Sequence, residues 1–180
     1  HNVPIFGWLM LGGKCSSCKE PIAWRYPAVE LLTAMVFMLT YWQIGFTVFL
    51  PVALVFVSTM IALLFIDAEH MILPNVITYP LSVFAIPLRL IYPLVFGTEY
   101  FSDMSYFPAT MMGGSPAWLV SLACALVGAL AGGGSLWFVG ELWKRFRGVE
   151  AMGLGDVKMM LGVGALLGWR LTLLSIFLGA

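Results

Sequence analysis

The sequence predicts an all-α protein: a polytopic transmembrane helical bundle with a cytoplasmic N-terminal loop region. Hydrophobic residues make up 61% of the 180 residues, charged residues only 10%, and the mean hydropathy is +0.97. Soluble domains carry about 25% charged residues, so this chain has too few charges to cover a water-facing surface. Several of its apolar runs reach the ~20 residues that a helix needs to cross a bilayer. The net charge of zero argues against nucleic-acid binding, which needs a basic surface.

The predicted elements follow the apolar runs along the chain. Residues 1–27 form the loop region, which is less apolar than the rest, and residues 28–180 form the membrane core. After Asp156 the apolar stretch is interrupted at Gly168–Arg170. This last stretch is either one span or a short helix followed by the start of another. The four spans that precede it are predicted, by length, at about Ala28–Phe46, Val48–Ile66, Val76–Val95 and Pro116–Trp143.

Basic residues gather before the first span and after the fourth, which lie on the same side of the membrane, and this predicts the orientation of the chain. The positive-inside rule makes their side cytoplasmic, and the loop with Glu99 and Asp103 then lies outside. Arg89, inside the third span, is the exception, and we expect it either to snorkel or to face the bundle interior. The basic residues before the first span and after the fourth are Lys14, Lys19, Arg25, Lys144, Arg145 and Arg147.

Two carboxylates lie at the predicted cytoplasmic ends of apolar runs. Asp67 closes the second span, and Asp156 opens the stretch after the fourth, at a similar depth. A carboxylate in a membrane is costly and usually faces other helices or a water-filled pocket. Two carboxyls brought together share a proton, because like charges a few ångströms apart cannot both ionise. One can then activate a water while the other protonates a carbonyl, which is the chemistry of an aspartic protease.

The residues around Asp156 suggest further roles, and two alternatives stay open. Gly153 and Gly155 leave room for another backbone, such as an extended peptide substrate. Lys158 could stabilise the ionised form of Asp156, and we expect it to bind substrate together with the two glycines. In the first alternative each acid is a solvated helix cap. The second is a proton- or ion-coupled transporter, which also uses membrane carboxylates, but normally near the midplane of repeated halves. No internal repeat is evident in the sequence.

The cysteines divide into a pair and a single residue. Cys15 and Cys18 form a CxxC motif in the predicted cytoplasmic loop, where a disulfide does not persist. Two thiolates at this spacing suit half of a tetrahedral zinc site, with an unligated loop as the alternative. Cys124 lies in the middle of the fourth predicted span, where we expect a small core residue.

Three segments, in this order along the chain, carry a family resemblance: "VPIFGWLMLGGKCSSCKEPIAWRYPAVELLTA" (Val3–Ala34), "FIDAEHMILPNVITYP" (Phe65–Pro80) and "EAMGLGDVKMMLGVGALLGW" (Glu150–Trp169). They resemble the bacterial prepilin peptidases, which are GxGD-type membrane aspartic proteases also called type IV leader peptidases. The resemblance covers nearly the whole chain. It implies that residues 28–180 are an aspartic protease core with Asp67 and Asp156 as its catalytic pair, and that further spans follow Ala180.

The resemblance also implies a function. The protein would be a multi-pass enzyme of the bacterial inner membrane, surrounded by lipid, with its catalytic site facing the cytoplasm. Its substrates would be type IV prepilins and type II secretion pseudopilins, whose leader peptides are cut at the cytoplasmic membrane face without a cofactor. Many members also methylate the new N-terminus from S-adenosylmethionine. Gly13 and Lys14, in "GGKC", resemble the region linked to that activity.

The chain departs from the family pattern at two places. The family typically shows Leu-Pro-Asp where this chain has Leu73, Pro74 and Asn75, so Asn75 cannot be a third acid. The resemblance also implies a second CxxC upstream of Cys15, outside this sequence. A zinc site formed by Cys15 and Cys18 would need that upstream pair to complete it.

Overall fold

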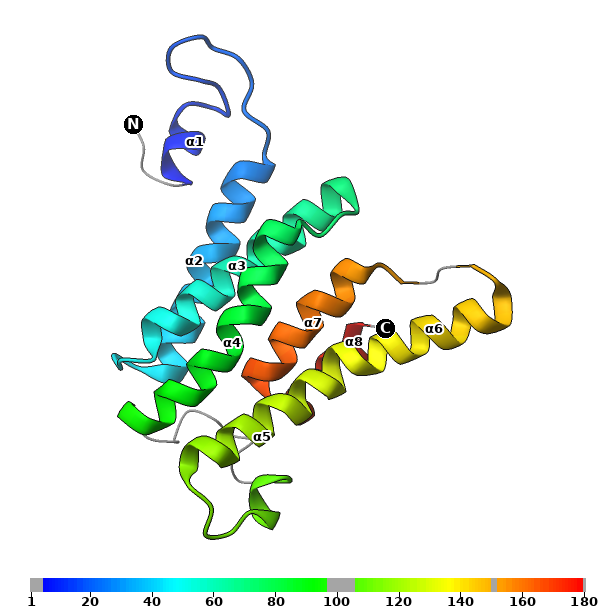
Figure 1. The fold of residues 1–180 in the computed structure, drawn as a ribbon. Coiled ribbons are helices and arrows are strands. Elements are labelled where there is room, and N and C mark those ends of the chain that lie inside the picture. The colour runs from blue at the N-terminus through cyan, green and yellow to red at the C-terminus, as the bar shows by residue number, and fades with distance from the viewer. Residues whose placement is uncertain (1–4, 97–105, 150–151, 180) are drawn as a thin grey trace. The chain divides into compact units, whose positions relative to one another are not determined.

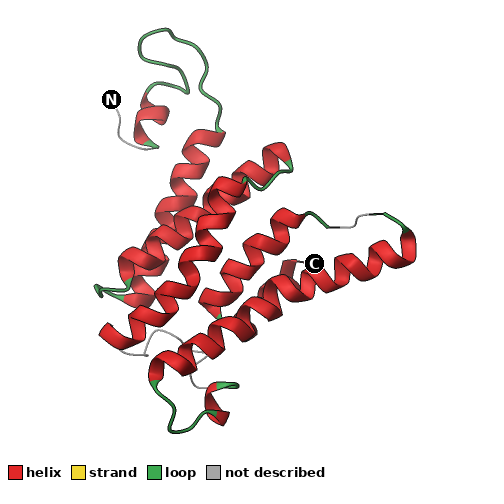
Figure 2. Ribbon diagram, viewed as in Figure 1, coloured by secondary structure: helices red, strands yellow, loops and turns green. Residues whose placement is uncertain are grey.

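The computed structural model describes residues 5–96, 106–149 and 152–179, and within these ranges the chain forms helices and connecting loops without a strand (Figure 2). The all-α prediction is therefore confirmed. Glu99, Asp103 and Glu150 lie outside the described residues. The prediction that the loop with Glu99 and Asp103 lies on the outer side of the membrane therefore falls outside them too. The chain divides into two compact units, His1–Phe65 and Ile66–Ala180, and each is described by itself.

The first unit joins a short loop region to two long helices. Helix α1 (Phe6–Met10) lies in the segment predicted as a loop, and α2 (Arg25–Ile44) begins three residues before the predicted first span. Most of α3 (Leu50–His70) also belongs to this unit. Both α2 and α3 are long and apolar enough to cross a membrane.

The second unit begins with the last turn of α3 and is otherwise a packed helical bundle. Figure 1 shows α7 lying between α4 and the long helix formed by α5 and α6. Gly168, with φ 79°, separates α7 from α8, so the apolar stretch after Asp156 is two helices and not one span. The elements that follow α3 are α4 (Asn75–Phe96), the short helix η2 (Ala109–Met111), α5 (Ala117–Ala129), the wider π-helical turn η3 (Leu130–Gly134), α6 (Ser135–Arg147), α7 (Leu154–Leu167) and α8 (Trp169–Gly179).

Among the described residues, four helices are long and apolar enough to span a membrane, as the sequence predicted. The last of them, Ala117–Arg147, runs for 31 residues through α5, η3 and α6 without a break. At 1.5 Å per residue it is about 46 Å long, whereas the hydrocarbon core is ~30 Å thick. Helix α7 has 14 residues and a length of about 21 Å, so it is too short to cross alone. The other three spans are Arg25–Ile44, Leu50–His70 and Asn75–Val95.

Small residues allow the helices of the second unit to pack closely. The buried side chains of Ala85, Ala125 and Ala165 form a cluster where α4, α5 and α7 meet. Gly128 of α5 and Gly164 of α7 face each other, and a β-carbon on either one would collide with the carbonyl oxygen of the other. Such small-residue contacts bring helix backbones together in membrane proteins. They hold α7 at a defined position against its neighbours.

Proline and arginine in α4 are both accommodated inside the bundle. Arg89 is completely buried. It therefore faces the bundle interior, which was one of the two expectations, and does not snorkel. Pro93, four residues further on, has no N–H to donate to the Arg89 carbonyl. The hydroxyl of Ser121 in α5 donates to that carbonyl instead, at 2.6 Å. Cys124, one turn further along α5, is fully buried, which confirms the prediction of a core residue.

Candidate active site

Asp67 lies in the last turn of α3, at an exposed position within the second unit. The N–H of Met71 donates to the Asp67 carbonyl at 2.7 Å, and Met71 has the left-handed conformation, with φ 51°. A residue in this conformation commonly ends a helix and redirects the chain. The turn thus leaves the Asp67 carboxyl at a helix end, followed by the short loop 71–74 that leads into α4.

Asp156 lies in the first turn of α7 and is half-buried. Gly153 precedes the helix in an extended conformation, and its backbone N–H donates a hydrogen bond to the Asp156 carboxyl. This contact is the carboxylate half of a capping box. Asp156 therefore makes a capping contact with the backbone of its own helix. This contact does not exclude a catalytic role, because a carboxyl has a second oxygen and four lone pairs in all.

The carboxyl groups of Asp67 and Asp156 lie close enough to interact electrostatically. Asp156 lies outside the four membrane-length helices. Its partial burial raises its pKa, the negative charge of Asp67 raises that pKa further, and the hydrogen bond from Gly153 opposes both effects. Burial and a like charge are the two causes that favour the protonated form of a carboxyl. The arrangement therefore suits a pair in which one group is protonated while the other is ionised.

The loop after Asp67 packs directly against the helix that carries Asp156. A β-carbon on Gly155 would lie 2.9 Å from the Cβ of Leu73. The absence of a side chain at Gly155 therefore makes room for this loop. The space next to Gly155 is thus filled by Leu73 of the same chain. Gly153 is exposed. A β-carbon added to Gly153 would lie 3.4 Å from the nearest atom, a carboxyl oxygen of Asp156.

Comparison with known families accounts for most of the chain. Residues 54–180 match the model of the type IV leader peptidase family, and residues 1–44 match the bacterial peptidase A24 N-terminal domain. The chain belongs to the type IV leader peptidase family. This agrees with the resemblance of its aspartate motifs, and it gives no support to the transporter alternative. No solved structure matches the chain significantly.

Several curated relatives of this type IV leader peptidase family member are named prepilin leader peptidase/N-methyltransferase. The relative from Pseudomonas aeruginosa is 38% identical over 180 residues, which are 100% of this chain and 53% of the relative. The one from Neisseria gonorrhoeae is 37% identical over 168 residues, 93% of this chain and 50% of the relative. The one from Aeromonas hydrophila is 35% identical over 184 residues, 100% of this chain and 55% of the relative. The chain thus spans about half the length of these relatives.

The Lys158 side chain of this family member is held by residues of α4. The causes that shift the pKa of Asp156 do not include Lys158. Its ammonium instead donates to Asn75 Oδ1 at 3.0 Å and lies 4.5 Å from the centre of the Tyr79 ring. The stabilisation of ionised Asp156 by Lys158 therefore stays a prediction. Whether Lys158 contacts substrate stays a prediction.

Sequence reasoning missed the part of α4 that faces α7. Asn75, Tyr79 and Ser82 recur at i, i+4 and i+7, which places them on one face of a helix. Ser82 Oγ donates to the Lys158 carbonyl at 2.7 Å, so it too contacts α7. The signal was present as a polar stripe in an otherwise apolar span, but nothing in the sequence shows which helix lies opposite.

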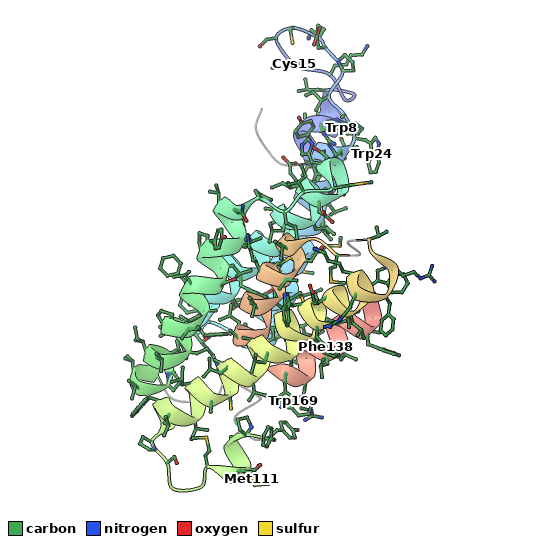
Figure 3. The ribbon with its side chains drawn as sticks, turned by 45° about the vertical axis from the view of Figure 1, so that its right-hand side comes forward. Trp8, Cys15, Trp24, Met111, Phe138 and Trp169 are labelled. Atoms are coloured by element: carbon green, nitrogen blue, oxygen red, sulfur yellow. The ribbon has the colours of Figure 1, made fainter. Side chains whose placement is uncertain are left out.

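The cysteine pair of this family member lies in the first unit, in a narrow loop. Figure 3 shows Cys15 at the far end of this loop, beyond Trp8. The Cys15 N–H donates to the Glu20 carbonyl at 2.9 Å, which closes the loop. Backbone N–H groups of Cys18 and Ser17 donate to the Cys15 sulfur and lower the pKa of its thiol, which favours the thiolate that binds metal. Within the described ranges, no group of three or more His, Cys, Asp or Glu residues could hold a metal.

Gly13 and Lys14, the predicted methyl-donor region, occupy the base of the same loop. Gly13 has φ 72°, and a β-carbon there would lie 3.0 Å from the ring of Trp8. The Trp8 ring is held in turn by a hydrogen bond of 3.0 Å from its Nε1 to the Ile22 carbonyl. Lys14 forms an isolated antiparallel bridge with Pro21. Gly13 is therefore needed for the shape of the loop, and the methyl-donor prediction stays a prediction.

Proposed function

We propose that the whole protein is an aspartic endopeptidase of the bacterial inner membrane that removes leader peptides from type IV prepilins and type II secretion pseudopilins. The observation that carries the proposal is that the charge of Asp67 raises the pKa of Asp156, with the two acids at the ends of two different helices. The names of the relatives support this class of substrate. The basic residues in the last turn of α6, and those before and at the start of α2, support a cytoplasmic position for the site.

In the proposed mechanism the two carboxyls hold one proton between them. Asp156 is the more buried group, and its raised pKa favours it as the proton carrier. Ionised Asp67 would remove a proton from a water molecule, whose oxygen attacks the carbonyl carbon of the scissile peptide bond. Asp156 would donate its proton to the carbonyl oxygen in the same step. The proton taken up by Asp67 would then pass to the leaving amine as the C–N bond breaks, while Asp156 is reprotonated from the new diol.

We further propose that the substrate's extended backbone approaches on the side of Gly153, where α7 begins. Gly153 is exposed and has no side chain to obstruct a peptide. Gly155 would support this site indirectly, because the space beside it is filled by Leu73, which packs the loop after Asp67 against α7. Lys158 was predicted to contact substrate as well, but its ammonium is engaged by Asn75. A contact with substrate would need that hydrogen bond to be exchanged.

The remaining proposals concern the loop region and the cofactors. Residues 1–27 would lie in the cytoplasm, and residues 28–180 would form the protease core within membrane lipid. Cys15 and Cys18 fit half of a zinc site, since both thiols are accessible and the Cys15 thiolate is favoured. An upstream Cys pair would supply the other half. Methylation from S-adenosylmethionine would involve Gly13 and Lys14. Proteolysis itself would need no cofactor.

The proposal is tested with the full-length protein, purified in detergent, and a synthetic prepilin peptide. We expect Asp67→Asn and Asp156→Asn each to abolish cleavage, because an amide can neither hold nor remove the shared proton. The double variant should be no worse than either single one, since residues that act as a unit are not additive. Glu69→Gln, an exposed position next to the site, serves as the control and should keep most of the activity. Retained cleavage in either Asn variant, or no cleavage by the wild type, would contradict the proposal.

A further inference from the structure

A cluster of three side chains fastens the start of α7 to the start of α4. Lys158 Nζ donates to Asn75 Oδ1 at 3.0 Å, and the same ammonium lies 4.5 Å from the centre of the Tyr79 ring. A cation at this distance from an aromatic face is attracted to it. The Lys158 backbone carbonyl also accepts a hydrogen bond of 2.7 Å from Ser82. Both the side chain and the backbone of Lys158 are therefore held by α4.

These contacts join the two chain segments that carry the acids. Lys158 follows Asp156 by two residues, and Asn75 follows Asp67 by eight. On the other side of Asp156, Gly155 packs against Leu73 of the loop between Asp67 and Asn75. The first turn of α7 is thus attached to the Asp67 segment both immediately before and shortly after Asp156. All of these residues belong to the second unit.

The charge of Lys158 is directed at the Tyr79 ring of α4 and not along α7 toward Asp156. Residues i and i+2 of a helix do not face each other, and Lys158 is not among the groups that shift the pKa of Asp156. The ammonium faces α4, where its hydrogen-bond partner is a neutral amide. These contacts fix the position of the first turns of α7 relative to α4.

We propose that Lys158 is a positioning residue, which acts through Asn75 and Tyr79 to hold Asp156 at its working distance from Asp67. The inference deepens the proposed function and rests on it for the catalytic consequence. Shared-proton chemistry demands close carboxyls, and a displacement of about 1 Å can cost about 100-fold in rate. Lys158 would thus set the rate of cleavage without touching the peptide.

The experiment combines cleavage kinetics with hydrogen exchange in the full-length protein in detergent. Lys158→Met removes the ammonium but keeps the length and helix propensity of the side chain. We expect kcat to fall about 10- to 100-fold with KM changed less than about threefold, and amide exchange in residues 152–158 to rise. Asn75→Leu should have the same effects, and the double variant should be no worse than Lys158→Met, because both changes break one contact.

Conservative variants and a charge-matched control complete the design. Asn75→Asp keeps an oxygen acceptor and Tyr79→Phe keeps the ring, so both should stay within about threefold of the wild-type kcat. Arg145→Met removes one positive charge from the last turn of α6, where Arg145 is exposed, and should change neither readout. Equal losses in Arg145→Met and Lys158→Met would show a general charge effect and overturn the proposal.

The two readouts separate this inference from the proposed function. Unchanged exchange in residues 152–158 of Lys158→Met would refute the positioning role, whatever the kinetics. A rise in KM with kcat unchanged would mean that Lys158 binds the peptide itself, which also refutes it. Faster exchange in a protein whose wild type cleaves no peptide would leave the contact with α4 established and the proposed protease function rejected.

Discussion

The glycine contact between α5 and α7 provides a sharp test of how the second unit is held together. In Gly164→Ala the new β-carbon would collide with the Gly128 carbonyl oxygen and lie 2.8 Å from its carbon. Ordinary van der Waals contact begins at 3.4 Å, so the carbon contact alone is too short by about 0.6 Å. The atoms that it meets are backbone atoms of a helix, which cannot turn away as a flexible side chain can. Helices α5 and α7 must therefore move apart.

The expected loss of stability is the difference between two terms. Overpacking in a closely packed interior costs about 1–3 kcal/mol. Replacing glycine by alanine within a helix returns up to about 1 kcal/mol. The difference lies between about 0 and 3 kcal/mol. We therefore expect Gly164→Ala to lower the free energy of unfolding by about 1–2 kcal/mol, the middle of this range, which corresponds to a fall in Tm of several degrees. Because Asp156 lies in the same helix, cleavage should fall about 10-fold as well.

The assay is thermal unfolding of the full-length protein in detergent, with cleavage of a prepilin peptide measured in parallel. Gly140→Ala in α6 is the matched control, because a β-carbon there would have only the Met152 Cβ nearby, at 3.6 Å. We expect this variant to be as stable as the wild type or more so, with unchanged activity. If Gly164→Ala behaved like Gly140→Ala in both measurements, the argument from helix packing would be refuted.

Two further predictions concern the cysteines and the pH dependence of stability. Cys15→Ser and Cys18→Ser should lower the zinc content or Tm of the full-length protein more than its cleavage rate; unchanged zinc content and Tm in both would reject a structural metal site. The pKa of Asp156 is raised in the folded state, so the stability from its tighter proton binding is present below the unfolded pKa, ~3.9, and is lost as the pH rises through the folded pKa. The Tm of the wild type should therefore fall, relative to that of Asp156→Asn, as the pH rises above the unfolded pKa of ~3.9, and a constant difference would contradict this.

The class of the protein and the placement of its spans follow from the sequence because they depend on local properties. A run of ~20 apolar residues has few ways to satisfy its backbone in a membrane except as a helix, and the observed spans agree with the predicted ones within a few residues. Asp67 and Asp156 could be singled out for the same reason, since a carboxylate at the end of such a run is costly. Cys124 was placed in the core by its position in the middle of a span.

The tertiary structure decided what depends on the neighbouring helix. Gly168 could have continued an apolar span, but its positive φ of 79° ends α7. Arg89 could have reached the membrane surface, but it is buried beside α5, where Ser121 binds its carbonyl. Lys158 lies next to Asp156 in the sequence, yet its ammonium is bound by Asn75, 83 residues away. The partner of a side chain depends on which helix packs against it. That packing is determined by small residues, far apart in the chain, that allow two helix backbones to approach each other.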